Sequence, residues 1–532
     1  MRGASATSLE TTPPMPTVRE QLLARRGDDH PGLVFEDETW TYDEVVRESC
    51  VRSAVLSALL DPDLPPHVGV LLENVPEFLF LLGGAALGGQ VVVGLNPTRR
   101  GPALAADVAR ADVQLVVTDA AHADLLADVD VPVLPLDCPD WAALVEEHAG
   151  AAVPDVEVGP DDLMMLIFTS GTSGDPKAVN VTQAKVAHPG RFLAERFGLG
   201  PDDVAYLSMP LFHSNAVMAG WGPALAAGAT VALARRFSAS GFLPDVRRYG
   251  ATYANYVGKP LTYVMATPER PDDADNPLRL VFGNEANDRD IAGFGRRFGC
   301  TVVDSYSSTE NAVVVQRVPD MPPGSLGRPL DGVKVLDPVT EEETPDAVFD
   351  AAGVLLNAEE ATGELVNTLG AGAFAGYYRD PDAEAERMRG GRYWSGDLAY
   401  RDAAGFVYFA GRTADWLRVD GENLAAAPVE RILLRHPAVA EAAVYAVPDD
   451  SVGDQVMAAL VVRGPLSPAG LEEFLAAQPD LSPKAWPRFV RVVGTLPRTA
   501  TNKVLKRELA AEGPVAGDGV LWTRAARGTS YA

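Results

Sequence analysis

The sequence predicts an α/β fold with parallel β-sheets. Short apolar runs of strand character alternate with longer stretches of helical periodicity along most of the chain. Parallel strands need a crossover connection, usually a helix, so this alternation favours parallel sheets covered by helices. With 532 residues, of which 47% are hydrophobic and 22% charged, the chain is long enough for more than one globular domain.

The predicted elements begin after residues 1–16, which are rich in Ser, Thr and Pro and are expected to be disordered. A helix is predicted near Thr17, a hairpin around the acidic turn Glu36-Asp37-Glu38, and an amphipathic helix over Tyr42–Leu60. The following strands and helices, in chain order, are strand Val68–Leu72, helix Pro76–Gly88, strand Val91–Leu95, helix Ala103–Ala111, strand Leu115–Thr118, strand Val204–Met209, helix Ala216–Ala226, strand Thr230–Leu233, helix Leu243–Arg248 and strand Tyr253–Val257.

A change of character near Gly411 predicts a second domain. We expect a large domain over residues 17–411 and a small α+β domain over residues 412–532, which is an ordinary domain size. The small domain is predicted to contain helices and strands at Pro428–Arg435, Val439–Val447, Val456–Val462 and Pro468–Gln478.

Charge and cysteine content exclude several function classes. A formal charge of -28 argues against nucleic-acid binding and against docking on anionic membranes. The three cysteines are far apart and unpaired in sequence, which argues against disulfides or a zinc site and predicts a cytoplasmic protein. No signal peptide is apparent. The apolar stretch Val217–Ala234 contains Pro223 and predicts a buried helix and strand rather than a membrane span.

The apolar run Leu163–Phe168 ends in a loop suited to holding phosphate. Gly171 and Gly174 allow backbone N–H groups to converge on an anion, and Lys177 adds a positive charge. Hydroxyl donors come from Thr169, Ser170, Thr172 and Ser173. The spacing differs from that of a Walker A loop, and an ordinary Ser/Thr/Gly turn is the alternative interpretation.

Five further segments carry chemistry-bearing residues, although each alone is also typical of a strand ending in a turn. The segment Asp304–Glu310 offers an aromatic ring, hydroxyl groups and a carboxylate that suits Mg²⁺ held jointly with phosphate. The others are Phe282–Ala286, Tyr393–Asp397, Gly411-Arg412 and Leu496–Lys503.

Together and in this order, these segments resemble the adenylate-forming superfamily of acyl-CoA synthetases, nonribosomal peptide adenylation domains and luciferases. The resemblance extends from about Trp40 to Leu509. Three segments, Ala254–Pro260, Phe282–Ala286 and Leu417–Asn423, are similar to the fatty-acid-transport-protein-like branch and to actinobacterial fatty-acid–CoA ligases. The resemblance implies a large N-terminal adenylate-forming domain with mixed and parallel sheets and a small, mobile C-terminal α+β domain.

The resemblance also implies a role for each motif. The loop Thr169–Lys177 would cover the β- and γ-phosphates, with Thr169 and Lys503 counted among the catalytic residues, and Glu310 would bind Mg²⁺. His213 would line the acid pocket and take part in catalysis. The remaining ATP contacts would be Gly283, Asn284, Glu285, Asp304, Ser305, Tyr306, Thr309, Asp397 and Arg412, and the remaining acid contacts would be Tyr256, Gly258, Asn311 and Ala312.

Four positions depart from the family pattern. Ala414 replaces the usual hinge residue, and Asn502 replaces the glycine before Lys503. Asn311 and Ala312 replace two glycines that line the acyl cleft in the family. Either the cleft is narrowed for a small or polar acid, or the Asn311 side chain points elsewhere.

The leading hypothesis is an AMP-forming ligase of fatty acid metabolism that uses ATP and Mg²⁺ to activate a small-molecule acid and transfers it to CoA. A second hypothesis keeps the adenylation but activates a very small acid such as nitrite for transfer to an amine, giving N–N bond formation in biosynthesis. A third is a nucleotide-binding sensor without catalysis. A homodimer is left open.

Overall fold

The computed structural model describes residues 16–170, 176–286, 288–318, 321–350, 355–412, 416–419, 422–449, 453–478, 481, 485–498, 504–525 and 528–532. The segment expected to be disordered, apart from Pro16, lies outside this description.

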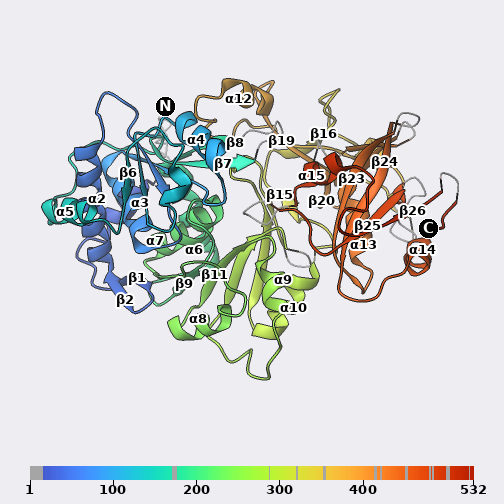
Figure 1. Ribbon diagram of the computed structural model, residues 1–532, viewed down its shortest axis with the longest axis horizontal. Helices are drawn as coiled ribbons and strands as arrows, with labels where there is room; N and C mark the ends of the chain where they lie inside the picture. Colours follow the sequence, from blue (N-terminus) through green and yellow to red (C-terminus); the bar gives the residue numbers. More distant parts are fainter. Residues whose placement is uncertain are drawn as a thin grey trace, which may run out of the picture. The chain divides into compact units, whose positions relative to one another are not determined.

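The chain forms two compact units, the first comprising residues 1–169, 178–255 and 275–279 and the second residues 170–177, 256–274 and 280–532. The predicted domain boundary at residues 411 and 412 stays a prediction. Figure 1 shows the elements coloured along the chain.

One six-stranded sheet confirms the predicted parallel arrangement. Its order is β6-β5-β3-β4-β7-β8, and the pairs β3/β4, β3/β5, β4/β7 and β5/β6 are parallel. Helix α3 (Pro76–Gly88) follows β3, is buried over Phe78–Leu87, and packs against α1 (Val18–Leu23) and α2 (Tyr42–Leu59). The strands are β3 (His67–Leu71), β4 (Val91–Gly94), β5 (Leu115–Thr118), β6 (Val133–Pro135), β7 (Leu163–Ser170) and β8 (Pro176–Thr182), and α4 (Gly101–Arg110) joins β4 to β5.

A second group of strands in the first unit has the order β11-β9-β10-β1-β2. The strands β1, β10, β9 and β11 pair in parallel, whereas β1 and β2 form the predicted antiparallel hairpin. Their bounds are β1 (Pro31–Phe35), β2 (Glu38–Thr41), β9 (Val204–Leu207), β10 (Thr230–Leu233) and β11 (Tyr253–Val257), with α8 (Phe242–Tyr249) between the last two.

The helix predicted over Ala216–Ala226 differs from a single α-helix. A π-helix, η2 (Asn215–Trp221), precedes the short helix α7 (Gly222–Ala227). Pro223 has no N–H to donate, so regular α-helical hydrogen bonding is interrupted at this junction. As predicted, Val217–Ala234 contains helix and strand. Within the described part of the chain, no helix is long and apolar enough to cross a membrane.

The start of α2 depends on a capping box. Thr41 Oγ1 accepts a hydrogen bond from the Glu44 N–H at 3.2 Å, and the Thr41 N–H donates to the Glu44 carboxylate at 2.8 Å. We expect Thr41→Ala to destabilise this unit by about 1 kcal/mol, because a backbone donor loses its acceptor. Differential scanning calorimetry should show a lower melting midpoint for Thr41→Ala, whereas Thr41→Ser, which keeps the oxygen, should stay close to wild type.

The second unit contains strands that position the candidate site. Strands β12 (Leu280–Asn284) and β13 (Thr301–Tyr306) pair in parallel, and β13 pairs antiparallel with β14 (Val315–Gln316). A separate five-stranded sheet has the order β16-β17-β19-β18, with β20 paired to β19. Its strands are β16 (Val333–Leu336), β17 (Gly363–Asn367), β18 (Met388–Arg389), β19 (Arg392–Arg401) and β20 (Val407–Arg412).

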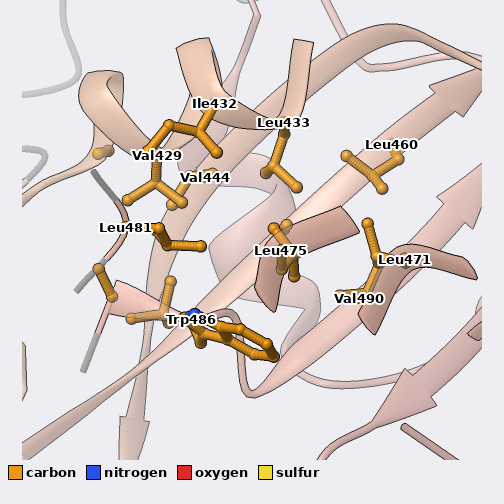
Figure 2. Close-up of a cluster of buried hydrophobic side chains, with 14 of the residues drawn as sticks. Val429, Ile432, Leu433, Val444, Leu460, Leu471, Leu475, Leu481, Trp486 and Val490 are labelled. Carbon is orange, nitrogen blue, oxygen red and sulfur yellow. The ribbon is translucent and has the colours of Figure 1, made fainter. Parts of the chain in front are cut away.

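The C-terminal part of the second unit has its own hydrophobic core. Figure 2 shows Val429, Ile432 and Leu433 of α13 (Ala426–Leu434) facing Leu471 and Leu475 of α14 (Pro468–Ala476) across strand residues such as Leu460. Each fully buried aliphatic side chain contributes about 1.5–3 kcal/mol. Strands β23 (Val439–Asp449) and β24 (Gly453–Val462) confirm two predicted strands, whereas β21 (Trp416–Val419), β22 (Glu422–Ala425), β25 (Phe489–Val493) and β26 (Val520–Thr523) were not predicted.

Candidate functional site

The ends of β12 and β13 bring four of the predicted ATP-binding residues together. In the parallel register, Gly283 lies opposite Asp304 and Asn284 lies opposite Ser305. The Asn284 side chain donates to the Ser305 carbonyl oxygen at 2.8 Å. Ligands in α/β proteins commonly bind at the carboxyl ends of parallel strands, so this edge is a suitable place for a nucleotide base.

Asp304 is buried at this edge and held by two donors. Its Oδ2 accepts from the Tyr256 hydroxyl at 2.6 Å and from the Ala286 N–H at 3.0 Å. Glu285 is exposed and has a φ of 67°, a left-handed turn that directs the next N–H toward Asp304. Burial raises the pKa of Asp304 to about 6, although both hydrogen bonds act to lower it.

Tyr256 and Gly258, predicted to contact the acid, lie against the edge formed by Asn284 and Asp304. The Gly258 N–H donates to the Asn284 carbonyl oxygen at 2.8 Å. A Cβ on Gly283 would fall 2.2 Å from the Tyr256 carbonyl oxygen, so this close approach requires glycine. Which ligand they contact remains a prediction.

Three further predicted ATP contacts, Tyr306, Asp397 and Arg412, also lie close together. The Tyr306 hydroxyl donates a hydrogen bond to the Asp397 carboxylate, and Asp397 is opposite Arg412 in the β19/β20 register. The Tyr306 ring lies 6.4 Å, centroid to centroid, from Phe409. An aromatic ring and a carboxylate are thereby linked directly, which suits a nucleoside.

Glu310 belongs to a buried network that the sequence did not predict. The Tyr377 hydroxyl donates to Glu310 Oε1 at 2.9 Å, and Lys177 Nζ lies 5.4 Å from the centre of the Tyr377 ring and 3.0 Å from Glu386 Oε2. Arg387 donates to the Trp394 carbonyl oxygen at 3.4 Å. Tyr377 and Arg387 were both missed, because neither stands in a pattern that distinguishes it from an ordinary core or surface residue.

The charge of Glu310 is maintained despite its burial. Burial acts to raise its pKa, but hydrogen bonds from its own N–H and from the Tyr377 and Ser308 hydroxyl groups, with the nearby Arg387 charge, lower the pKa below its usual value. An ionised carboxylate suits Mg²⁺. No group of three or more His, Cys, Asp or Glu side chains able to hold a metal occurs among the described residues, so an ion at Glu310 would also need substrate phosphate oxygens.

Asn311 closes its own loop. Its φ of 54° is left-handed, the conformation that glycine adopts easily and asparagine tolerates. Its Oδ1 accepts from the Ser307 hydroxyl at 2.8 Å, and its N–H donates to the Ser308 carbonyl oxygen at 3.0 Å. This geometry favours the interpretation that the side chain points back into the loop. Ala312 is buried, and its carbonyl oxygen accepts from Asn367.

His213 belongs to the first unit and is half-buried in the segment that joins β9 to the π-helix η2. Its ring lies 4.3 Å, centroid to centroid, from the ring of Phe212. Nearby, Asn255 in the middle of β11 donates to Asn215 Oδ1 of η2 at 2.7 Å. Single π-helical turns are frequent at functional sites, so this segment suits a ligand-binding role.

Some predicted residues are only partly described. Thr169 is half-buried at the end of β7, and Thr309 is half-buried beside Glu310. Gly171, Thr172, Ser173, Gly174, Ala414, Asn502 and Lys503 lie outside the described residues, as do the side chains of Ser170 and Arg412.

Comparison with known families finds two matching profiles. The profile described as "AMP-binding enzyme" matches residues 20–378, and that described as "AMP-binding enzyme C-terminal domain" matches residues 428–503. The first match covers more than half of the chain.

Known proteins of similar sequence are named as CoA ligases or CoA synthetases. The "Medium/long-chain-fatty-acid--CoA ligase FadD17" of Mycobacterium tuberculosis is 55% identical over 96% of this chain and 99% of its own length. The "Steroid-22-oyl-CoA synthetase" of Rhodococcus jostii is 52% identical over 93% of this chain and 90% of its own length.

Solved structures show a similar fold. The ATP-bound crystal structure of MatB from Rhodopseudomonas palustris has a TM-score of 0.81 and 25% identity, covering 93% of this chain and 98% of that one. The o-succinylbenzoate CoA synthetase MenE from Bacillus subtilis, in complex with its acyl-adenylate intermediate, has a TM-score of 0.76 with the same identity and coverage.

Proposed function

This chain belongs to the AMP-binding enzyme family, and from that membership we propose that it is an ATP-dependent, AMP-forming ligase that joins a carboxylic acid to CoA. The observation that carries the proposal is the high identity, over nearly the full length, to relatives named as a CoA ligase and a CoA synthetase. The grouping of Tyr306 with Asp397 and of Glu310 with Tyr377 supports it.

The first half-reaction forms an acyl-adenylate. A carboxylate oxygen of the acid attacks the α-phosphorus of ATP, and the bond from that phosphorus to pyrophosphate breaks. Positioning and charge neutralisation supply most of the catalysis in phosphoryl-type transfers. In this proposal the edge at Asn284 and Asp304 holds adenine, Tyr306 and Asp397 hold the nucleoside, and Lys177 and Lys503 face the phosphates. Mg²⁺ bound by Glu310 and phosphate oxygens would neutralise charge on the leaving pyrophosphate.

The second half-reaction transfers the acyl group to CoA. The thiol loses its proton, its sulfur attacks the acyl carbonyl carbon, and AMP leaves with the electrons of the carbon–oxygen bond. We propose that the domain over residues 412–532 moves between the two steps, as the sequence resemblance implies, so that one site serves two reactions.

The acid is proposed to be large and apolar. The relatives are named for medium- or long-chain fatty acids and for a steroid acid. The hydrogen bond from Ser307 holds the Asn311 side chain within its own loop, so the replacement of glycine there does not require a small substrate. The names of the relatives favour a thiol acceptor over nitrite transfer to an amine, and ligase activity over a non-catalytic sensor.

The test is a pyrophosphate-release screen with and without CoA. We expect pyrophosphate release with octanoate, palmitate or a steroid carrying a carboxylated side chain. The rate of AMP release should increase at least tenfold when CoA is added. Acetate, and nitrite with an aryl amine, should give rates near background. CoA-independent AMP release with nitrite and amine, or no release with any acid, would contradict the proposal. Size-exclusion chromatography of the same preparation measures the oligomeric state, which is left open.

A further inference from the structure

The Tyr256 hydroxyl donates a hydrogen bond to the Asp304 carboxylate. The two oxygens are 2.6 Å apart, and the side chains are buried, with Tyr256 2% and Asp304 8% exposed. Burial and the adjacent carboxylate raise the pKa of Tyr256 well above its usual value, so the hydroxyl keeps the proton that it donates. Both this bond and the bond from the Ala286 N–H fall on Oδ2. Among the described contacts, Oδ1 is therefore the oxygen left to accept from a ligand.

The position of the Tyr256 ring is fixed by its packing on Gly283. A Cβ placed on Gly283 would lie 2.6 and 2.7 Å from two carbons of the ring, so the ring rests directly on the glycine backbone. Gly283 is in turn the register partner of Asp304. The ring and the carboxylate that its hydroxyl contacts are thus located by the same pair of strands.

We propose that Tyr256 is a positioning residue for nucleotide recognition, which orients the Asp304 carboxylate toward the 6-amino group of adenine. This rests on the proposed function, because it takes the base at this edge to be that of ATP. A carboxylate accepts a hydrogen bond from the 6-amino group of adenine but repels the carbonyl oxygen of a 6-oxopurine. Since a site built to accept one hydrogen bond rejects an analogue that lacks the donor, Tyr256 contributes to the preference for ATP over ITP.

The charge of Asp304 gives a readout that a purely structural role would not change. Burial raises its pKa to about 6, while the bonds from Tyr256 and Ala286 and the charge of Arg317 lower it and that of Glu285 raises it. ATP binding should therefore weaken as the pH falls through about 6, when Asp304 takes up a proton. Removing the Tyr256 hydroxyl removes a hydrogen bond that favours the ionised form of Asp304. The fall in ATP affinity on the acid side of the pH profile, called the acid limb below, should therefore move to higher pH.

The test compares Tyr256→Phe with Tyr253→Phe by calorimetric titration of the full chain with ATP and with ITP, without any acid. Tyr253 lies on the same strand, and its hydroxyl donates instead to the Ala219 carbonyl oxygen at 2.5 Å. For Tyr256→Phe we expect about tenfold weaker ATP binding, an ATP-over-ITP preference reduced by a similar factor, and the acid limb shifted to higher pH. Tyr253→Phe should keep the wild-type preference for ATP over ITP and the wild-type acid limb of ATP binding.

A double-mutant cycle shows whether Tyr256 acts through Asp304. Asp304→Asn should remove the acid limb, and adding Tyr256→Phe to it should change the ATP-over-ITP preference by less than about twofold. A wild-type preference and an unmoved limb in Tyr256→Phe would overturn the inference, as would a limb that survives Asp304→Asn. Because binding is measured without an acid, selective ATP binding with no pyrophosphate release from any acid would refute the proposed function while leaving this inference standing.

Discussion

Replacing Glu310 by glutamine is expected to slow acyl-adenylate formation on the order of 100-fold, the scale of one preorganised electrostatic contact. Glutamine has nearly the same shape and keeps an oxygen for the Tyr377 hydroxyl, which lies 2.9 Å from Glu310 Oε1. The substitution removes the charge, which the surrounding hydrogen bonds preserve by lowering the pKa of Glu310, and replaces one acceptor oxygen by an NH2 group. Single-turnover pyrophosphate release, measured at several Mg²⁺ concentrations, should show both a lower rate and a higher Mg²⁺ requirement.

The control for this prediction is Asp382→Asn, which removes one exposed carboxylate of the same unit, at the start of helix α12 (Pro381–Arg387). It changes the net charge equally and should leave the rate within about twofold of wild type. An unchanged Mg²⁺ requirement in Glu310→Gln would contradict a metal-binding role. A rate loss without that change would instead indicate that Glu310 orients Tyr377 and the groups around it.

The parallel sheets could be predicted because their strands are buried on both faces. Strands β3, β4 and β5 are apolar apart from His67 and Thr118 at their ends, and all of their residues are buried. Most predicted bounds fall within two residues of the observed ones, and α3, β5, β10 and β11 match at both ends. The π-helix η2 was not predicted, because the residues Asn215–Trp221 keep an ordinary helical composition and differ from an α-helix only in their hydrogen bonding.

The candidate site was less accessible to sequence reasoning because it depends on contacts between distant residues. The link between Glu310 and Tyr377 joins positions 67 residues apart, and that between Tyr306 and Asp397 joins positions 91 apart. The family resemblance made Glu310, Tyr306 and Asp397 candidates because they stand in short motifs, but Tyr377 stands in none that was recognised. The direction of the Asn311 side chain could not be read from its residue type, since a left-handed turn and a hydrogen bond from Ser307 determine it.

Replacing Lys503 by alanine is expected to slow adenylation on the order of 100- to 1,000-fold while sparing transfer from a preformed adenylate. Lys503 lies outside the described residues, and its role is a proposal from its motif Leu496–Lys503. A lysine that stabilises charge passing between the acid and the α-phosphate contributes only while that charge develops. Pyrophosphate release should fall, whereas CoA-thioester formation from supplied acyl-adenylate should stay within about threefold of wild type.

The contrast between the two half-reactions is what makes the Lys503 experiment informative. Arg507→Ala removes an exposed positive charge four positions further along the chain and should slow neither half-reaction by more than about twofold. Equal losses in both halves for Lys503→Ala would mean that the lysine stays at the reacting atoms throughout, which would contradict a domain movement between the steps. A loss confined to adenylation would support that movement, because the charge needed for the first step would then be absent from the second.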